Sequence, residues 1–285
     1  MLRFSANLSM LFGEYDFLAR FEKAAQCGFR GVEFMFPYDY DIEELKQVLA
    51  SNKLEHTLHN LPAGDWAAGE RGIACIPGRE EEFRDGVAAA IRYARALGNK
   101  KINCLVGKTP AGFSSEQIHA TLVENLRYAA NMLMKEDILL LIEPINHFDL
   151  HGIQAVGSGS CTGVAVTDHN ISDGVTVFVP DETVQIDIFA DMGDVGCCNL
   201  KIQYDIYHMQ RMEGELTNTM TQWADKIGHL QIADNPHRGE PGTGEINYDY
   251  LFKVIENSDY NGWVGCEYKP QTTTEAGLRW MDPYR

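Results

Sequence analysis

The chain has 285 residues, of which 45% are hydrophobic and 23% charged, and it carries 24 Lys and Arg against 41 Asp and Glu, a formal net charge of −17 at pH 7. This composition is typical of a soluble globular protein with a sizeable core. So acidic a surface repels phosphate backbones and anionic lipids, which disfavours nucleic-acid and membrane partners. A small anionic substrate stays compatible, because a metal or a local arginine reverses the field inside a pocket.

The N-terminal stretch MLRFSANLSMLFGEYDF lacks the basic start, the continuous apolar run and the small-residue cleavage site of a signal peptide. No run approaches the roughly 18 apolar residues of a membrane span. The seven cysteines are an odd number and form neither CxxC pairs nor a disulfide framework, so reduced thiols are expected. These features predict a cytoplasmic protein.

Short apolar, β-branched runs alternate with longer helical patterns along the chain. The predicted strands are 3–9, 31–36, 56–61, 101–107, 138–145, 200–208, 227–234 and 262–270. The predicted helices are 15–28, 41–52, 80–98, 114–136, about 213–226, 248–258 and 273–281. The strands are apolar through their length, as expected when both faces of a parallel sheet are buried.

Eight such βα units in about 250 residues are typical of a (β/α)8 TIM barrel, which predicts one domain over residues 1–285. A doubly wound open sheet is the alternative fold. It would require a glycine-rich first βα turn, and SANLSMLFGEYD contains no GxGxxG. A nucleotide cofactor is therefore not expected.

The fifth βα unit is too long. More than 50 residues separate the strand that ends near 145 from the strand that begins near 200, whereas the other units need roughly 30 residues each. We interpret 147–179 as a β-rich insertion in the fifth βα loop, where GVAVTD and GVTVFV alternate like short strands. The stretch 180–193 is a weak candidate for helix five, because its β-branched residues disfavour a helix.

Four successive strands end in oxygen-bearing side chains: Glu143, Asp205, either Gln231 or Asp234, and Glu267. A single acidic residue at a strand end is more often a helix cap or a solvated loop residue, but four in succession weaken that interpretation. In a barrel these ends converge at one mouth. Converging carboxylates need a cation or shifted pKa values, and oxygen ligands suit Mg²⁺ or Mn²⁺.

Four further residues are candidates for substrate binding. His208 follows Asp205 by three positions, and Arg238 lies in the loop after the seventh strand, where it could bring a cation to an anionic substrate. His59 lies near the mouth end of the third strand, and Lys269 follows Glu267 by two positions and should share its face. Each also has an ordinary interpretation, as a core histidine or an exposed turn residue.

Five segments together resemble the hydroxypyruvate isomerase family of the xylose-isomerase-like TIM-barrel superfamily. They are RFSANLSMLF, IEPIN, QYDIYHMQRMEG, HLQIADNPHRGEPGTGEINY and GWVGCEYKP. The resemblance covers roughly 1–149 and 194–285. It implies interconversion of hydroxypyruvate, a small anionic hydroxy-keto acid, with tartronate semialdehyde.

The resemblance also implies roles for residues. Glu143 and Glu267 match the catalytic proton-transfer pair, and a divalent metal, which is not necessarily obligatory, would be held by Glu143, Asp205, Gln231 and Glu267. A nearby relative isomerises 2-oxo-tetronate, so the substrate is less certain than the reaction type. A homo-oligomer is compatible with this family.

The segment 150–193 departs from the family, where a short loop and an amphipathic helix are expected. It could be a natural lid, an engineered graft with a GSGS joint at 157–160, or an altered coding segment. Four functions are therefore compared: the hydroxypyruvate or 2-oxo-tetronate isomerase, a ketose 3-epimerase, a metal phosphodiesterase of the endonuclease branch, and a catalytically inactive barrel scaffold. The charge of −17 disfavours the phosphodiesterase.

Overall fold

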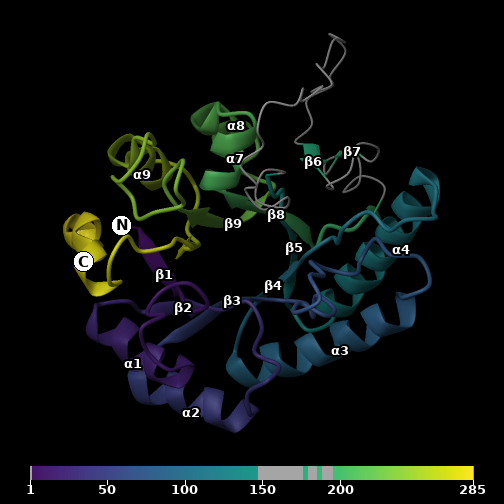
Figure 1. The fold of residues 1–285 in the computed structure, drawn as a ribbon, viewed down its shortest axis with the longest axis horizontal. Helices are drawn as coiled ribbons and strands as arrows, with labels where there is room; N and C mark the ends of the chain where they lie inside the picture. The colour runs from purple at the N-terminus through teal and green to yellow at the C-terminus, as the bar shows by residue number, and fades with distance from the viewer. Residues whose placement is uncertain (1, 147–175, 179–184, 188–194, 285) are drawn as a thin grey trace.

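The computed structural model describes residues 2–146, 176–178, 185–187 and 195–284. Parallel strands close into a barrel in the order β1-β10-β9-β8-β5-β4-β3-β2, and helices cover its outside (Figure 1). The barrel strands are β1 (Arg3–Asn7), β2 (Gly31–Glu33), β3 (Glu55–Asn60), β4 (Lys101–Cys104), β5 (Leu139–Ile142), β8 (Leu200–Asp205), β9 (Ile227–Ile232) and β10 (Trp263–Cys266). This closed ring confirms the predicted TIM barrel and excludes the alternative fold, the doubly wound open sheet.

The helices alternate with these strands around the ring (Figure 1). They are α1 (Phe17–Gln26), α2 (Ile42–Asn52), α3 (Glu80–Leu97), α4 (Ser115–Met134), α7 (Ile206–Met212), α8 (Leu216–Gln222), α9 (Tyr248–Glu256) and the 3-10 helix η1 (Glu275–Tyr284). Among the described residues, none of these helices has both the length and the apolar character needed to cross a bilayer.

The outer helices form because their sequences combine an apolar stripe with caps. In α4 the Ser114 side chain accepts the backbone N–H of Gln117, and the Gln117 side chain accepts the N–H of Ser114, a complete capping box. Helix α3 buries one face and ends at Gly98, whose φ of 73° suits the left-handed C-terminal position. Both helices lie within two residues of their predicted bounds.

The strand predicted over 200–208 is too long. Strand β8 ends at Asp205, whose side chain accepts the backbone N–H of Tyr207 at 2.9 Å and so caps the new helix α7. The single helix predicted over about 213–226 is also wrong in extent, because α7 ends before Gly214, which has φ 66°, and α8 covers only Leu216–Gln222. His208 consequently lies on a helix immediately above the end of β8.

Most of the predictions for 147–179 and 150–193 fall outside the described residues, GVAVTD among them. Two short pieces are described, β6 (Thr176–Phe178) and β7 (Gln185–Asp187). They pair antiparallel, with Val177 opposite Ile186. The predicted strand in GVTVFV is therefore confirmed, and a helix through 185–187 is wrong, in line with the β-branched residues of both pieces.

Candidate active site

Polar side chains gather at the carboxyl-terminal mouth of the barrel. Asp205 is the last residue of β8, Glu143 and Glu267 directly follow β5 and β10, and Gln231 lies near the end of β9. A cavity of about 260 Å³ is lined by the predicted residues Glu143, Gln231, Glu267, His208 and Arg238. Asp205 stands beside it, fully buried. The ring closure therefore brings together the side chains that the strand ends predicted.

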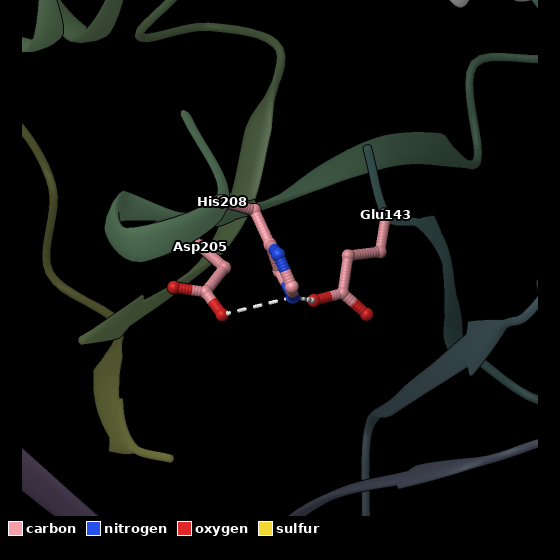
Figure 2. A group of neighbouring side chains, drawn as sticks. All are labelled: Glu143, Asp205 and His208. Carbon is pink, nitrogen blue, oxygen red and sulfur yellow. Dashed lines mark ion pairs between the residues drawn. The ribbon is translucent and has the colours of Figure 1, made fainter. Parts of the chain in front are cut away.

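Glu143, Asp205 and His208 face one another across the mouth (Figure 2). The His208 Nε2 atom lies 3.5 Å from Asp205 Oδ2 and 3.8 Å from Glu143 Oε1. One ligand atom from each of the three residues lies within 4.8 Å of the others. This spacing is short enough for a shared cation, so the state of the imidazole decides whether His208 could be one of its ligands.

The other nitrogen of His208 indicates its tautomer. The backbone N–H of Asn146 donates to Nδ1 at 3.3 Å, so Nδ1 acts as an acceptor. Burial lowers the pKa of His208 well below its usual value, which keeps the imidazole neutral. The proton of the neutral ring then sits on Nε2 and points to the carboxylates, which suits a hydrogen-bond donor better than a metal ligand.

The carboxylates lie where ionisation is costly. Burial raises the pKa of Asp205 to about 6 and that of Glu267 to about 8, although the Arg238 charge lowers both. Burial also raises the pKa of Glu143 well above its usual value, and the charges of Glu267 and Asp205 raise it further. Desolvation and mutual repulsion together create a demand for positive charge at this mouth.

Arg238 supplies part of that charge. Its Nη2 atom lies 3.1 Å from Glu267 Oε1 and 3.7 Å from Asp205 Oδ2. Its guanidinium also lies over the Tyr207 ring, 5.2 Å from the centroid. One guanidinium does not balance the charge of Glu143, Asp205 and Glu267 when all three are ionised.

The donor set fits a divalent cation. Asp205 Oδ2 is fully buried and has no hydrogen-bond partner among the described residues. A buried anionic oxygen without a donor is unfavourable, and a bound cation would relieve this. Oxygen-rich ligation of this kind is what Mg²⁺ and Mn²⁺ prefer.

The end of β9 offered two candidates, and they have different surroundings. The Gln231 side chain lines the cavity, donating to Glu33 Oε1 at 2.7 Å and accepting from Gln203 Nε2 at 2.7 Å. Its carbonyl oxygen keeps a second lone pair that could reach a cation. Asp234 instead faces the loop that follows β9, where its two carboxylate oxygens accept four backbone N–H groups at 2.9–3.0 Å, from Asn235, Ile246, Gly242 and Gly244.

We expect Asp234→Ala to lower the free energy of unfolding by at least about 3 kcal/mol, because hydrogen bonds to a charged group contribute about 1.5–3 kcal/mol each. The loop it organises carries Arg238, so activity should fall as well. Chemical denaturation measures the first effect. Asp225→Ala, at a carboxylate whose side chain is 72% exposed, is the control and should change stability by less than about 1 kcal/mol. Equal stability of the two variants would contradict the role of Asp234.

The structure does not bring His59 and Lys269 to the cavity. His59 belongs to β3, and its side chain is buried on the face of the strand that points away from the cavity. There its Nδ1 atom lies 3.0 Å from Asn99 Nδ2 and its ring stacks on His56. Leu58 and Asn60 on either side of it line the cavity, so alternation along the strand directs His59 away. Lys269 is exposed, and its backbone N–H donates to the carbonyl of Arg238 at 2.7 Å.

Sequence reasoning missed several polar residues of the mouth. Glu33 ends β2, is fully buried, and accepts hydrogen bonds from Asn7 at 3.1 Å and from Gln231 at 2.7 Å. Glu33 could have been found by the same sequence signal that identified Glu143, Asp205 and Glu267, namely a carboxylate at the end of an apolar strand. The amides that line the cavity at the ends of β1 and β3 and beside the end of β8 were missed too: Asn7, Asn60 and Gln203.

Another cavity, of about 550 Å³, lies between α8 and α9, away from the mouth. Its lining is mostly apolar and includes Met220, Ile227 and Val254. It contains none of the predicted site residues. The smaller cavity at the barrel mouth is therefore the candidate active site.

Comparison with known proteins finds relatives that match this chain along its whole length. A family model described as xylose isomerase-like TIM barrel matches residues 21–176 and 185–284. The chain is 85% identical over 285 residues to "Hydroxypyruvate isomerase" of Escherichia coli, covering 100% of both chains. It is 42% identical to "2-oxo-tetronate isomerase" of Cupriavidus necator, covering 100% of this chain and 99% of the relative.

Among solved structures, one from Brucella melitensis titled "AP endonuclease, family 2" has a TM-score of 0.86 at 41% identity and covers 100% of both chains. A D-allulose 3-epimerase from Methylomonas has a TM-score of 0.66 at 19% identity, covering 98% of this chain and 88% of that one, which shows a shared fold alone. With full-length matches to curated isomerases far above chance, the chain belongs to the xylose isomerase-like TIM barrel family, within it to the hydroxypyruvate isomerase family, and it is an isomerase.

Proposed function

We propose that this isomerase interconverts hydroxypyruvate and tartronate semialdehyde through an enediol. The observation that carries the proposal is the pair Glu143 and Glu267, both buried and both lining the cavity at the mouth. The 85% identity to the Escherichia coli enzyme, over all of both chains, supports the choice of substrate.

The reaction moves one proton between adjacent carbons. One glutamate removes a proton from the hydroxymethyl carbon of hydroxypyruvate, and the electron pair passes to the carbonyl oxygen, which takes up a proton to give the enediol. A proton is then delivered to the former carbonyl carbon, while the hydroxyl on the other carbon loses its proton and becomes the aldehyde oxygen. Two carboxyl groups in one cavity provide the base and the acid that such a transfer requires.

The remaining residues of the mouth orient the substrate and balance charge. We assign Glu143, Asp205, Gln231 and Glu267 as the residues that would hold Mg²⁺ or Mn²⁺. When bound, such an ion supplies Lewis-acid stabilisation to the developing enediolate. His208, with its proton on Nε2, would donate to a substrate hydroxyl, and Arg238 would hold Glu267 in place through their 3.1 Å contact.

Removal of divalent metal tests the proposal. Purified protein is assayed with hydroxypyruvate, first with EDTA and then with added Mg²⁺ or Mn²⁺. We expect turnover to fall by at least about 100-fold with EDTA and to return with either ion, because the buried carboxylates then lose the charge that stabilises the enediolate. Calcium or buffer alone serves as the control addition. Turnover that is indifferent to EDTA would reject the metal, and no turnover of hydroxypyruvate under any condition would reject the substrate.

A second substrate is supported by a specific observation. The Cupriavidus necator relative, at 42% identity over nearly its whole length, is a 2-oxo-tetronate isomerase. That substrate has one more carbon than hydroxypyruvate and undergoes the same kind of proton transfer. Comparison of kcat/KM for the two acids separates the candidates, and a preference for 2-oxo-tetronate would reassign the substrate while leaving the glutamate pair intact.

A further inference from the structure

The wall of the cavity contributed by the loop after β3 carries a cation that the proposed reaction has not used. Trp66 and Arg71 both line the cavity that Glu143 and Glu267 line. The Arg71 guanidinium stacks on the Trp66 ring at 3.9 Å from its centroid. Its Nη1 atom donates to the backbone carbonyls of Trp66 at 3.2 Å and Glu70 at 2.6 Å. The guanidinium is thus partly oriented, and it is only half-buried.

The backbone that carries Arg71 is fastened to the barrel. Gly72 forms an antiparallel bridge with Val106, and its N–H donates to the carbonyl of Ala63 at 3.0 Å. Gly72 has φ 112°, and a Cβ there would lie 2.1 Å from the carbonyl oxygen of Leu105. Only glycine permits this close approach. Arg71 is therefore positioned by the scaffold, as binding residues need to be.

The nearest acidic neighbour in the chain is already engaged. Both carboxylate oxygens of Glu70 contact Arg79, at 2.5 and 3.2 Å. One of them also accepts the backbone N–H of Asp65. Across the described part of the chain, no carboxylate forms an ion pair with Arg71. With respect to the described residues, the other guanidinium N–H groups of Arg71 can therefore donate to an anionic ligand.

The other arginine of the cavity differs in this respect. Arg238 already contacts Glu267 at 3.1 Å and lies 3.7 Å from Asp205. A substrate carboxylate that bound Arg238 would have to compete with these two carboxyl groups for the same guanidinium. A substrate anion therefore gains more from Arg71, which forms no ion pair among the described residues, than from Arg238, whose charge already faces carboxyl groups.

We infer that Arg71 binds the carboxylate of the substrate, and that the cavity thereby selects small hydroxy-keto acids over neutral hydroxy-ketones. The inference rests on the proposed function in that it names the residue that recognises the acid group of that substrate. A planar guanidinium suits this task because it binds a carboxylate through two parallel hydrogen bonds. The reacting carbons then lie toward Glu143 and Glu267.

Ligand binding gives the first test. Calorimetry with saturating Mg²⁺ measures the affinity for D-glycerate, which cannot isomerise, and for its neutral amide. Hydrogen bonds between charged groups are strong enough that we expect Arg71→Met to weaken glycerate binding about 10- to 100-fold and to leave the amide unchanged. Arg71→Lys should recover part of the loss. The control is Arg84→Met, at an arginine that also lies over an aromatic ring, Tyr128, but on helix α3 outside the cavity.

Kinetics gives the second test. In Arg71→Met we expect KM for hydroxypyruvate to rise about 10-fold or more while kcat changes by less than about 3-fold, since the interaction is made equally in the ground and transition states. Unchanged KM and unchanged glycerate affinity, in a variant with a native circular dichroism spectrum, would overturn the inference while the proposed function stood. Equal losses for glycerate and its amide would also overturn it, because they would indicate a collapsed loop.

The opposite outcome is distinguishable. If the unmodified protein does not isomerise hydroxypyruvate but binds glycerate through Arg71, the proposed substrate fails and the assignment of the carboxylate site stands. The two conclusions are therefore tested by separate measurements, the turnover of the unmodified protein and the effect of Arg71 on affinity.

Discussion

Glu143→Gln and Glu267→Gln should each reduce kcat for hydroxypyruvate by about 10²–10⁴-fold, the usual contribution of a positioned acid or base. Glutamine keeps the shape of the side chain but cannot exchange a proton in the transfer. Because glutamate and glutamine fill nearly the same space, KM should change much less than kcat. A steady-state assay with the metal present measures both constants.

In the metal-free protein, Glu143→Gln should not lower the melting temperature, although it lowers kcat. Burial and like-charge repulsion raise the pKa of Glu143, so a neutral amide removes an unfavourable charge. We expect Glu143→Gln to melt no lower than the unmodified protein. Glu136→Gln is the control, since Glu136 lies beyond the end of α4 and contacts Arg95 at 3.5 Å. Near-normal turnover in either active-site variant would reject its assignment to the proton transfer.

Replacing Asp205 should separate two functions of one side chain. Its Oδ1 atom caps α7 through Tyr207, and its Oδ2 atom has no hydrogen-bond partner among the described residues and faces His208. Asp205→Ala removes both, and we expect a loss of about 1 kcal/mol of stability from the cap. Asp205→Asn keeps an oxygen for the cap and removes the charge.

Both substitutions should abolish the stabilisation that we expect Mn²⁺ to give the unmodified protein. A ligand at 100 times its Kd adds about 2.7 kcal/mol to the free energy of unfolding. Thermal or chemical denaturation with and without Mn²⁺ measures this increment, and kcat should fall by at least about 100-fold in both variants. If Asp205→Asn kept the full Mn²⁺ increment, Asp205 would not be a ligand, and its buried oxygen would need another explanation.

The elements of the barrel were predictable because their signals are local. An apolar run such as the LLLI of β5 is buried on both faces whichever strands flank it. The Ser114 cap of α4 depends only on Gln117, three residues further along the chain. The error at β8 has a local cause too. Asp205 is both the last residue of β8 and the N-cap of α7. The first residues of α7, Ile206 and Tyr207, are apolar and buried, so the apolar pattern of the strand continues into the helix and hides the point where the backbone changes conformation.

The site was predictable in part for the same reason. The position of a carboxylate at the end of a strand is visible in the sequence, and a closed parallel barrel brings all such ends to one mouth. This reasoning placed Glu143, Asp205 and Glu267 together. Applied consistently it would have included Glu33, which ends β2 in the same manner.

The partners of each side chain were not predictable. Gln231 and Asp234 are equally plausible at the end of β9, and only the path of the following loop directs Asp234 to its four N–H donors. His59 was predicted to face the cavity, but Leu58 and Asn60 line it instead, and alternation along β3 directs His59 to the other face. Arg71 carried no signal, because its loop reaches the cavity through one bridge between Gly72 and Val106.

The amino-acid order by itself determined that this protein is a βα barrel with acidic strand ends, since strand burial and helix capping depend on neighbours a few residues away. The tertiary structure decided which polar groups share the cavity and which two arginines stand at its walls. Those relations depend on contacts between residues as distant as Arg71 and Glu267, and they arise only when the last strand pairs with the first and the ring closes.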